Sequence, residues 1–164
     1  MKKPSIGVSS CLGGVKCRYD GGSNPVDQLQ TLVQQGEAVM ICPEVIGGLQ
    51  TPRTPAEIVG GDGFAVWQNQ AKVITKTGED VTESFKAGAI KAFAELQEAG
   101  VTTVVLKAKS PSCGCGLIYD GSFSGVKITG VGVATAYFIN QGLMVLSDED
   151  WLKKTTEGAS IHGA

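Results

Sequence analysis

Short apolar runs alternate along the chain with segments that have the spacing of amphipathic helices. Four of the runs have the length and composition of buried strands, and the run richest in β-branched residues is expected to be central in a sheet. They span residues 6–10, 38–41, 101–106 and 143–146, of which 101–106 is the β-branched run. The alternation predicts a single-domain α/β fold, Rossmann-like, with a largely parallel sheet flanked by helices.

Three segments between these strands are expected to form helices, and the first two have helical spacing. They cover residues 26–35, the stretch from Asp80 to about Glu98, and residues 133–140. Asp80 and Glu83 predict a capping box for the second helix. Ser147 predicts the cap of a short terminal helix in the sequence SDEDWLKK.

Three further expectations concern the remaining segments. Residues 64–67 and 72–75 predict a small β-hairpin. Residues 45–63 contain two prolines and five glycines without a clear period, which predicts a long ordered loop or a mobile lid. We expect one domain over residues 1–164, with a flexible tail at 155–164.

Composition narrows the classes of function. The 164 residues carry 14 Lys and Arg against 16 Asp and Glu, a net charge of -2, so we expect a small ligand and no nucleic acid partner. No apolar run approaches the roughly 18 residues that a membrane span needs. We therefore expect a cytoplasmic protein without a membrane partner; the sequence does not indicate an oligomeric state.

The chain has five cysteines and one histidine, His162. In a reducing cytosol such cysteines are packing residues, reactive thiols or metal ligands rather than disulfides. A metal site in this chain would be built from sulfur and oxygen, which excludes most histidine-rich zinc and iron sites.

Three of the cysteines, Cys11, Cys42 and Cys113, follow predicted strands at or shortly after their carboxyl ends. These ends share one edge of a parallel sheet, where ligands bind, so the three thiols are expected to converge. The alternative is that they are buried packing residues. Thiolates suit zinc, copper(I) or an iron–sulfur cluster. Without a CxxC pair the fold would assemble the site, with an open coordination position if only three cysteines bind. Cys17 is a possible accessory ligand or second thiol, and Cys115 is expected to be scaffold.

Polar residues near these cysteines are candidates for chemistry. Glu44 follows Cys42 by two residues and Ser110 precedes Cys113 by three, so both could face a ligand at the open position. Arg53 is one of two arginines in a lysine-rich chain, which makes it a candidate for bidentate recognition. Together with Arg53, we expect Ser10 and Asn24 to bind substrate.

Four blocks of the sequence resemble the signature blocks of the thiouracil desulfidase family, in the same order. They read SSCLGGVKCRYDGGSN, CPEVIGGLQTPRTPAEI, GEDVTESFKAGA and LKAKSPSCGCGLIYDGSFSG, within about residues 5 to 150. The resemblance implies an oxygen-sensitive [4Fe-4S] cluster with three cysteine ligands, matched here by Cys11, Cys42 and Cys113. The fourth iron would be open to the sulfur of a thiolated pyrimidine such as 2-thiouracil. The family's catalytic positions match Glu44 and Ser110.

The chemistry of these residues agrees with the implied activity. An iron with an open position would supply a Lewis acid for a C=S bond, Glu44 would act as general base or proton relay, and Ser110 would pass a proton near the leaving sulfur. The predicted function is a non-redox desulfidase that converts 2-thiouracil and water to uracil and sulfide. The alternatives are a non-catalytic iron–sulfur or thiol sensor and a zinc hydrolase with a three-cysteine site.

Overall fold

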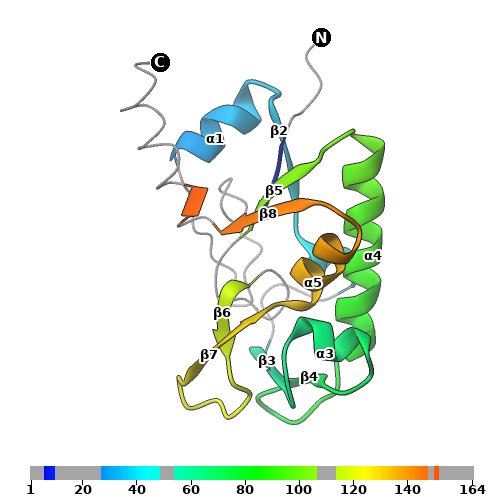
Figure 1. Cartoon of the computed structure of the whole chain (residues 1–164), viewed down its shortest axis with the longest axis vertical. Coiled ribbons are helices and arrows are strands. Elements are labelled where there is room, and N and C mark those ends of the chain that lie inside the picture. Colours follow the sequence, from blue (N-terminus) through cyan, green and yellow to red (C-terminus); the bar gives the residue numbers. More distant parts are fainter. Residues whose placement is uncertain (1–5, 10–26, 49–53, 107–113, 148–149, 152–164) are drawn as a thin grey trace.

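A parallel sheet of four strands organises the chain (Figure 1). The computed structural model describes residues 6–9, 27–48, 54–106, 114–147 and 150–151. The strands are β1 (Ile6–Ser9), β2 (Ala38–Ile41), β5 (Thr103–Leu106) and β8 (Met144–Ser147), in the order β2-β1-β5-β8. Each neighbouring pair is parallel, which confirms the predicted strands and the predicted single-domain α/β fold.

Helices cover both faces of this sheet. On one face α1 (Asp27–Gln34) packs Leu29 against Val8 and Val105. On the other face α4 (Thr82–Glu98) and α5 (Val133–Asn140) pack against Val104 and Leu106. Side chains alternate between the faces of a strand, so consecutive residues of β5 serve different helices and the result is three layers.

A smaller β-rich part lies at one end of α4 (Figure 1). Its strands form two antiparallel pairs, β3 (Ala56–Val59) with β4 (Lys72–Thr75) and β6 (Cys115–Tyr119) with β7 (Lys127–Val131). Together with the short helix α3 (Gly63–Trp67) they enclose a separate core. Phe85 of α4 is buried in that core, whereas Leu96 of the same helix belongs to the core of the sheet. One helix therefore serves both cores.

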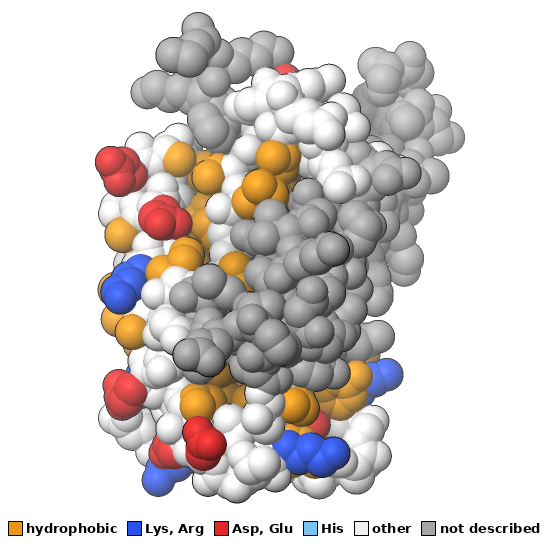
Figure 2. Space-filling view, turned by 180° about the vertical axis from the view of Figure 1, so that it is seen from behind, with side chains coloured by type: hydrophobic (Ala, Val, Ile, Leu, Met, Phe, Trp, Pro, Cys, Tyr) orange, Lys and Arg blue, Asp and Glu red, His pale blue; other side chains and the backbone are white. Residues whose placement is uncertain are grey.

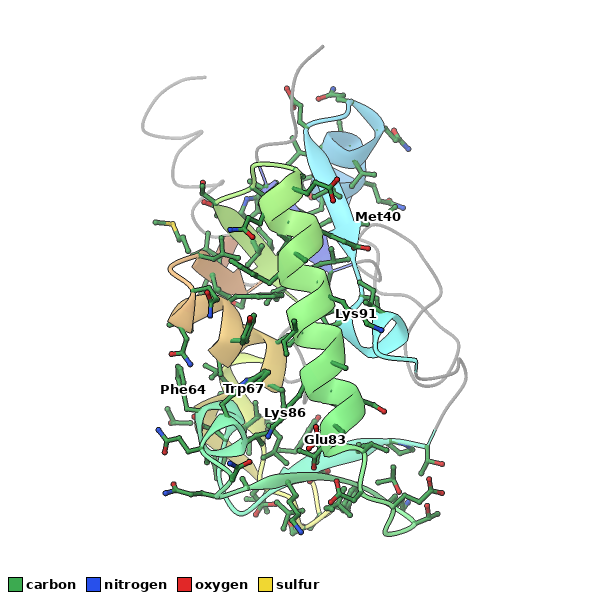
Figure 3. All side chains as sticks on the ribbon, turned by 90° about the vertical axis from the view of Figure 1, so that its right-hand side faces the viewer. Met40, Phe64, Trp67, Glu83, Lys86 and Lys91 are labelled. Atoms are coloured by element: carbon green, nitrogen blue, oxygen red, sulfur yellow. The ribbon has the colours of Figure 1, made fainter. Side chains whose placement is uncertain are left out.

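Trp67 joins α3 to α4 and α5. Its Nε1 donates a hydrogen bond of 2.9 Å to the carbonyl oxygen of Val133, at the start of α5. Its ring centroid lies 4.9 Å from that of Tyr137, which Phe93 of α4 meets edge-on. Lys86 of α4 lies beside the Trp67 ring, with Nζ 5.7 Å from the centroid (Figure 3). These contacts hold the β-rich part against the sheet layer.

The predicted hairpin of residues 64–67 with 72–75 is wrong. Residues 63–67 form α3, whose N-terminus is capped by Asp62 Oδ1, the acceptor of a 3.2 Å bond from the Ala65 amide. Strand β4 pairs with β3 instead. Four apolar residues are too few to distinguish a helical turn from a strand, and the capping carboxylate decides for the helix.

The segment 45–63, expected to be a loop or lid, contains regular structure on both sides of residues 49–53. The helix α2 (Pro43–Ile46) runs into it, and β3 occupies Ala56–Val59. The antiparallel partner β4, which lies later in the chain, stabilises β3. The predicted tail at 155–164 lies outside the described residues.

The capping box predicted from Asp80 and Glu83 is also wrong. α4 begins at Thr82, and its N-cap residue makes no side-chain capping bond. Thr82 Oγ1 instead accepts a 2.9 Å hydrogen bond from the Val73 amide of β4, and the Thr82 amide donates to Asp80 Oδ1 at 2.9 Å. Hydrogen bonds from the Thr82 side chain and backbone lower the pKa of Asp80.

The cap predicted at Ser147 is confirmed, because the Ser147 Oγ accepts a 3.0 Å hydrogen bond from the Asp150 amide.

Glu57 of β3 holds the turn of the β6–β7 hairpin, which the sequence pattern does not predict. Its Oε1 accepts hydrogen bonds from the amides of Gly121 at 3.0 Å and Phe123 at 3.2 Å. Phe123 has a φ of 57°. This conformation costs a non-glycine residue free energy, and it persists only where the surrounding structure stabilises it. A single carboxylate thus ties the two antiparallel pairs together.

We expect Glu57→Ala to lower the free energy of unfolding by about 1–2 kcal/mol, because two partly buried amides lose their acceptor. Glu57→Gln keeps a carbonyl oxygen as acceptor and retains most of the stability. Urea unfolding measures the change, and amide hydrogen exchange at Gly121 and Phe123 locates it. Glu98→Ala, an exposed carboxylate at the end of α4, is the control. Unchanged exchange in Glu57→Ala would contradict the role.

Candidate functional site

Three strands end side by side at the carboxyl edge of the sheet. Ser9 and Ile41 are paired at the ends of β1 and β2, and Leu106 ends β5, the other neighbour of β1. The segments that leave these three strands therefore start next to one another, at the edge where open α/β sheets bind ligands.

Each of these segments carries one of the three candidate ligands. Cys42 follows Ile41 directly, Cys11 follows Ser9 by two residues, and Cys113 follows Leu106 by seven. The structure thus brings together the starting points of the three segments, as expected from the sequence. Cys42 is the candidate ligand that can be located.

The other predicted site residues lie outside the described part of the chain. They are Ser10, Cys11, Cys17, Asn24, Arg53, Ser110 and Cys113. For Glu44 and Cys115 the backbone is described and the side chain is not. Glu44 is the second residue of α2, and Cys115 is the first residue of β6, where its backbone is paired with Val131.

Cys42 stands at the junction of β2 and α2. It is half-buried and packs against the core cluster that contains Val8 and Leu29. Its carbonyl oxygen accepts a 2.9 Å hydrogen bond from the Ile46 amide, which closes the single turn of α2. Pro43 is the first residue of that turn, where the fixed φ of proline suits a helix and no donor is lost. The sequence Cys-Pro-Glu thus forms a tight strand-to-helix corner.

Gly114 anchors the chain directly after Cys113. It is buried, and its carbonyl oxygen accepts a 2.8 Å hydrogen bond from the amide of Gly132, the N-cap residue of α5. Gly63 of α3 packs closely on Gly132, since a Cβ on Gly63 would overlap the Gly132 carbonyl and lie 2.9 Å from the Val131 oxygen. The last residue before β6 is therefore held by the N-cap residue of α5, on which α3 also packs.

The donor set at this edge suits a thiophilic metal group. Cys42 lies at the strand end, and the segments that follow β1 and β5 contain one further candidate cysteine each. Three thiolates are soft ligands of the kind that hold iron–sulfur clusters. Cys42, the described one of these cysteines, is half-buried. The residues present fit such a cluster.

The distribution of charged side chains on the described surface does not indicate a particular ligand or partner. On the face seen in Figure 2, the Lys, Asp and Glu side chains of the described residues are interspersed. The expected absence of a nucleic acid partner stays a prediction. None of the helices in the described ranges is long and apolar enough to cross a membrane.

Comparison with known proteins decides the family. Residues 6–150 match the family model described as 2-thiouracil desulfurase. The chain belongs to this family. It is 50% identical over 143 residues to the uncharacterized protein YbbK of Bacillus subtilis (strain 168), a similarity that covers 87% of this chain and 95% of YbbK. The resemblance seen in the four sequence blocks is thereby confirmed.

A solved structure shares the fold. The [4Fe-4S]-dependent thiouracil desulfidase TudS is similar to this chain with a TM-score of 0.81 and 40% sequence identity. The similarity covers 97% of this chain and 99% of the TudS chain. The arrangement of sheet, helices and hairpins described above is therefore that of a desulfidase.

Proposed function

We propose that this protein is a [4Fe-4S]-dependent desulfidase that converts 2-thiouracil and water to uracil and hydrogen sulfide. The observation that carries the proposal is the common carboxyl edge of β2, β1 and β5, from which three cysteine-bearing segments leave. The match to the 2-thiouracil desulfurase family and the 40% identity to a [4Fe-4S]-dependent desulfidase support it.

In this proposal Cys11, Cys42 and Cys113 hold the cluster through three thiolates. When bound, the cluster supplies an iron without a protein ligand, a soft Lewis acid for the sulfur of the substrate. Arg53, Ser10 and Asn24 bind the pyrimidine, and Cys17 is an accessory thiol. The proposed compartment is the cytoplasm, because thiolate ligands persist in a reducing environment.

The remaining chemistry is proton transfer by Glu44 and Ser110. The Glu44 carboxylate accepts a proton from the water whose oxygen bonds to the carbon that carries the sulfur. The Ser110 hydroxyl passes a proton to the leaving sulfur. The C=S double bond of the substrate is replaced by a C=O double bond, and both protons of the water end on sulfide, so no external electron donor is needed. With one histidine in the chain, far from these segments in sequence, a carboxylate and a hydroxyl are suitable groups for the task.

We expect Cys42→Ser to lose the cluster and Cys115→Ser to keep it. The loss should appear as a fall of about tenfold or more in bound iron and acid-labile sulfide after anaerobic purification, with loss of the brown colour. Circular dichroism checks that both variants remain folded. A wild-type protein that binds zinc in place of iron and sulfide would contradict the cluster.

We expect Glu44→Gln to keep the cluster and to lower kcat for 2-thiouracil by about 10²- to 10⁴-fold, because the amide cannot accept the proton. Loss of thiouracil absorbance and release of sulfide measure the reaction on the same anaerobic sample. Glu98→Gln, at the far end of α4, is the matched control. A loaded wild-type protein that releases no sulfide from any thiolated base would favour the sensor alternative.

A further inference from the structure

Gly88 lies inside α4, where a glycine is unexpected. The helix is otherwise rich in alanine, with Ala87 and Ala89 on either side of the glycine. Glycine is the poorer helix former because its backbone loses more conformational freedom. Gly88 is buried, so we looked to its packing for the reason that glycine occupies this position.

The reason is the close approach of α2. A Cβ on Gly88 would overlap the carbonyl oxygen of Pro43 and lie 2.8 Å from its carbonyl carbon and 3.2 Å from the amide nitrogen of Gly47. All of these atoms belong to the backbone, which cannot move aside as a flexible side chain can. Figure 3 shows α2 against the middle of α4.

The contact has a matching glycine on the other side. A Cβ on Gly47, the residue after α2, would overlap the Ser84 carbonyl oxygen of α4 and lie 3.2 Å from the Gly88 Cα. Two glycines, one on each partner, thus allow the backbones of α2 and α4 to touch. The short turn of α2 is thereby seated on the longest helix of the described chain.

The seated turn is the Cys-Pro-Glu corner. The Pro43 carbonyl belongs to the peptide group that joins Pro43 to Glu44, and it also accepts the 2.9 Å hydrogen bond from the Gly47 amide. The Cys42 carbonyl accepts the bond from Ile46, whose side chain packs against the core cluster that contains Ala89. Any displacement of the Pro43 carbonyl therefore moves the backbone between Cys42 and Glu44.

We propose that Gly88 and Gly47 are positioning residues that set Cys42 and Glu44 at the carboxyl edge of the sheet. The proposal rests on the proposed function, in which Cys42 is a cluster ligand and Glu44 the base. A misplacement of about 1 Å at such a corner is enough to cost about 10²-fold in rate, and weakened support of a ligand costs about 10- to 100-fold in metal affinity or activity.

The experiment compares Gly88→Ala with Gly100→Ala in the full chain. Gly100 follows α4 and has a φ of 75°, and a Cβ there would meet no atom within 4 Å, so alanine strains the backbone without touching α2. For Gly88→Ala we expect bound iron or kcat to fall by about tenfold or more, although alanine is the better helix former. Gly100→Ala should keep both values while losing stability to urea.

A readout on the cluster-free protein separates this proposal from the proposed function. The rate of Cys42 alkylation by iodoacetamide, located by peptide mass spectrometry, should change several-fold in Gly88→Ala and stay at the wild-type value in Gly100→Ala. If the anaerobically purified wild-type protein contained no iron, the proposed function would be wrong, but the alkylation test of the positioning role would still apply. If Gly88→Ala has the same rate of Cys42 alkylation, the same iron content and the same kcat as the wild-type protein, the positioning role is wrong.

Gly47→Ala disrupts the same contact from the α2 side. It replaces Gly88→Ala in the experiment if that variant does not fold. The backbone of Gly47 is outside the left-handed region, so its Cβ acts only through the overlap with Ser84. The same losses are expected. If both variants are unfolded where Gly100→Ala is folded, the contact is a requirement of the fold and the positioning role is wrong.

Discussion

Parallel pairing of β1 with β2 on one side and β5 on the other is the interaction on which the site is built. Parallel strands all point the same way, so their carboxyl ends lie at one edge and the segments that follow them start together. Cys42 follows its strand directly, and Cys11 and Cys113 stand in the segments that leave the two neighbours. Cysteines that are distant in sequence can therefore serve one group. A proposed cluster needs no local ligand motif when the sheet supplies the proximity.

The long helix α4 packs on several parts of the molecule that support this edge. It contributes Leu96 to the core of the sheet and Phe85 to the core of the β-rich part, and its middle supports the Cys-Pro-Glu corner through Gly88. On the other side, Gly132 at the start of α5 holds Gly114, next to Cys113, and Gly63 of α3 packs on Gly132. The Cys-Pro-Glu corner and Gly114, the residue after Cys113 in the sequence, are thus held by backbone contacts. Gly88 and Gly63 have no room for a side chain, because a Cβ on either would overlap a backbone carbonyl.

Much of the sheet layer could be predicted from local pattern. The β-branched run before Lys107 can be recognised as a strand from its composition, and the mostly apolar segment before Gly142 has the length of a helix. The bounds predicted for α5 are those of the structure, Val133–Asn140. The segment around Phe64 is too short for this, and its helix depends on the Asp62 carboxylate. The β6–β7 hairpin escaped prediction because its turn, with Phe123 at positive φ, is stabilised by Glu57 from a distant strand. A contact between residues so far apart leaves no periodic signal in either segment.

Sequence alone was sufficient for the class of fold, the family and the placement of three cysteines after strand ends, because strand runs, helical periods and ordered motifs are local features. The three-dimensional structure was needed to establish which strands pair, that β4 joins β3, and that α2 is seated on α4. Gly88 is visible in the sequence as a glycine within an alanine-rich helix. The sequence does not show that it contacts Pro43 and Gly47. Pairing and close approach depend on the shape of surfaces distant in the chain, and those surfaces exist only once the cores have formed.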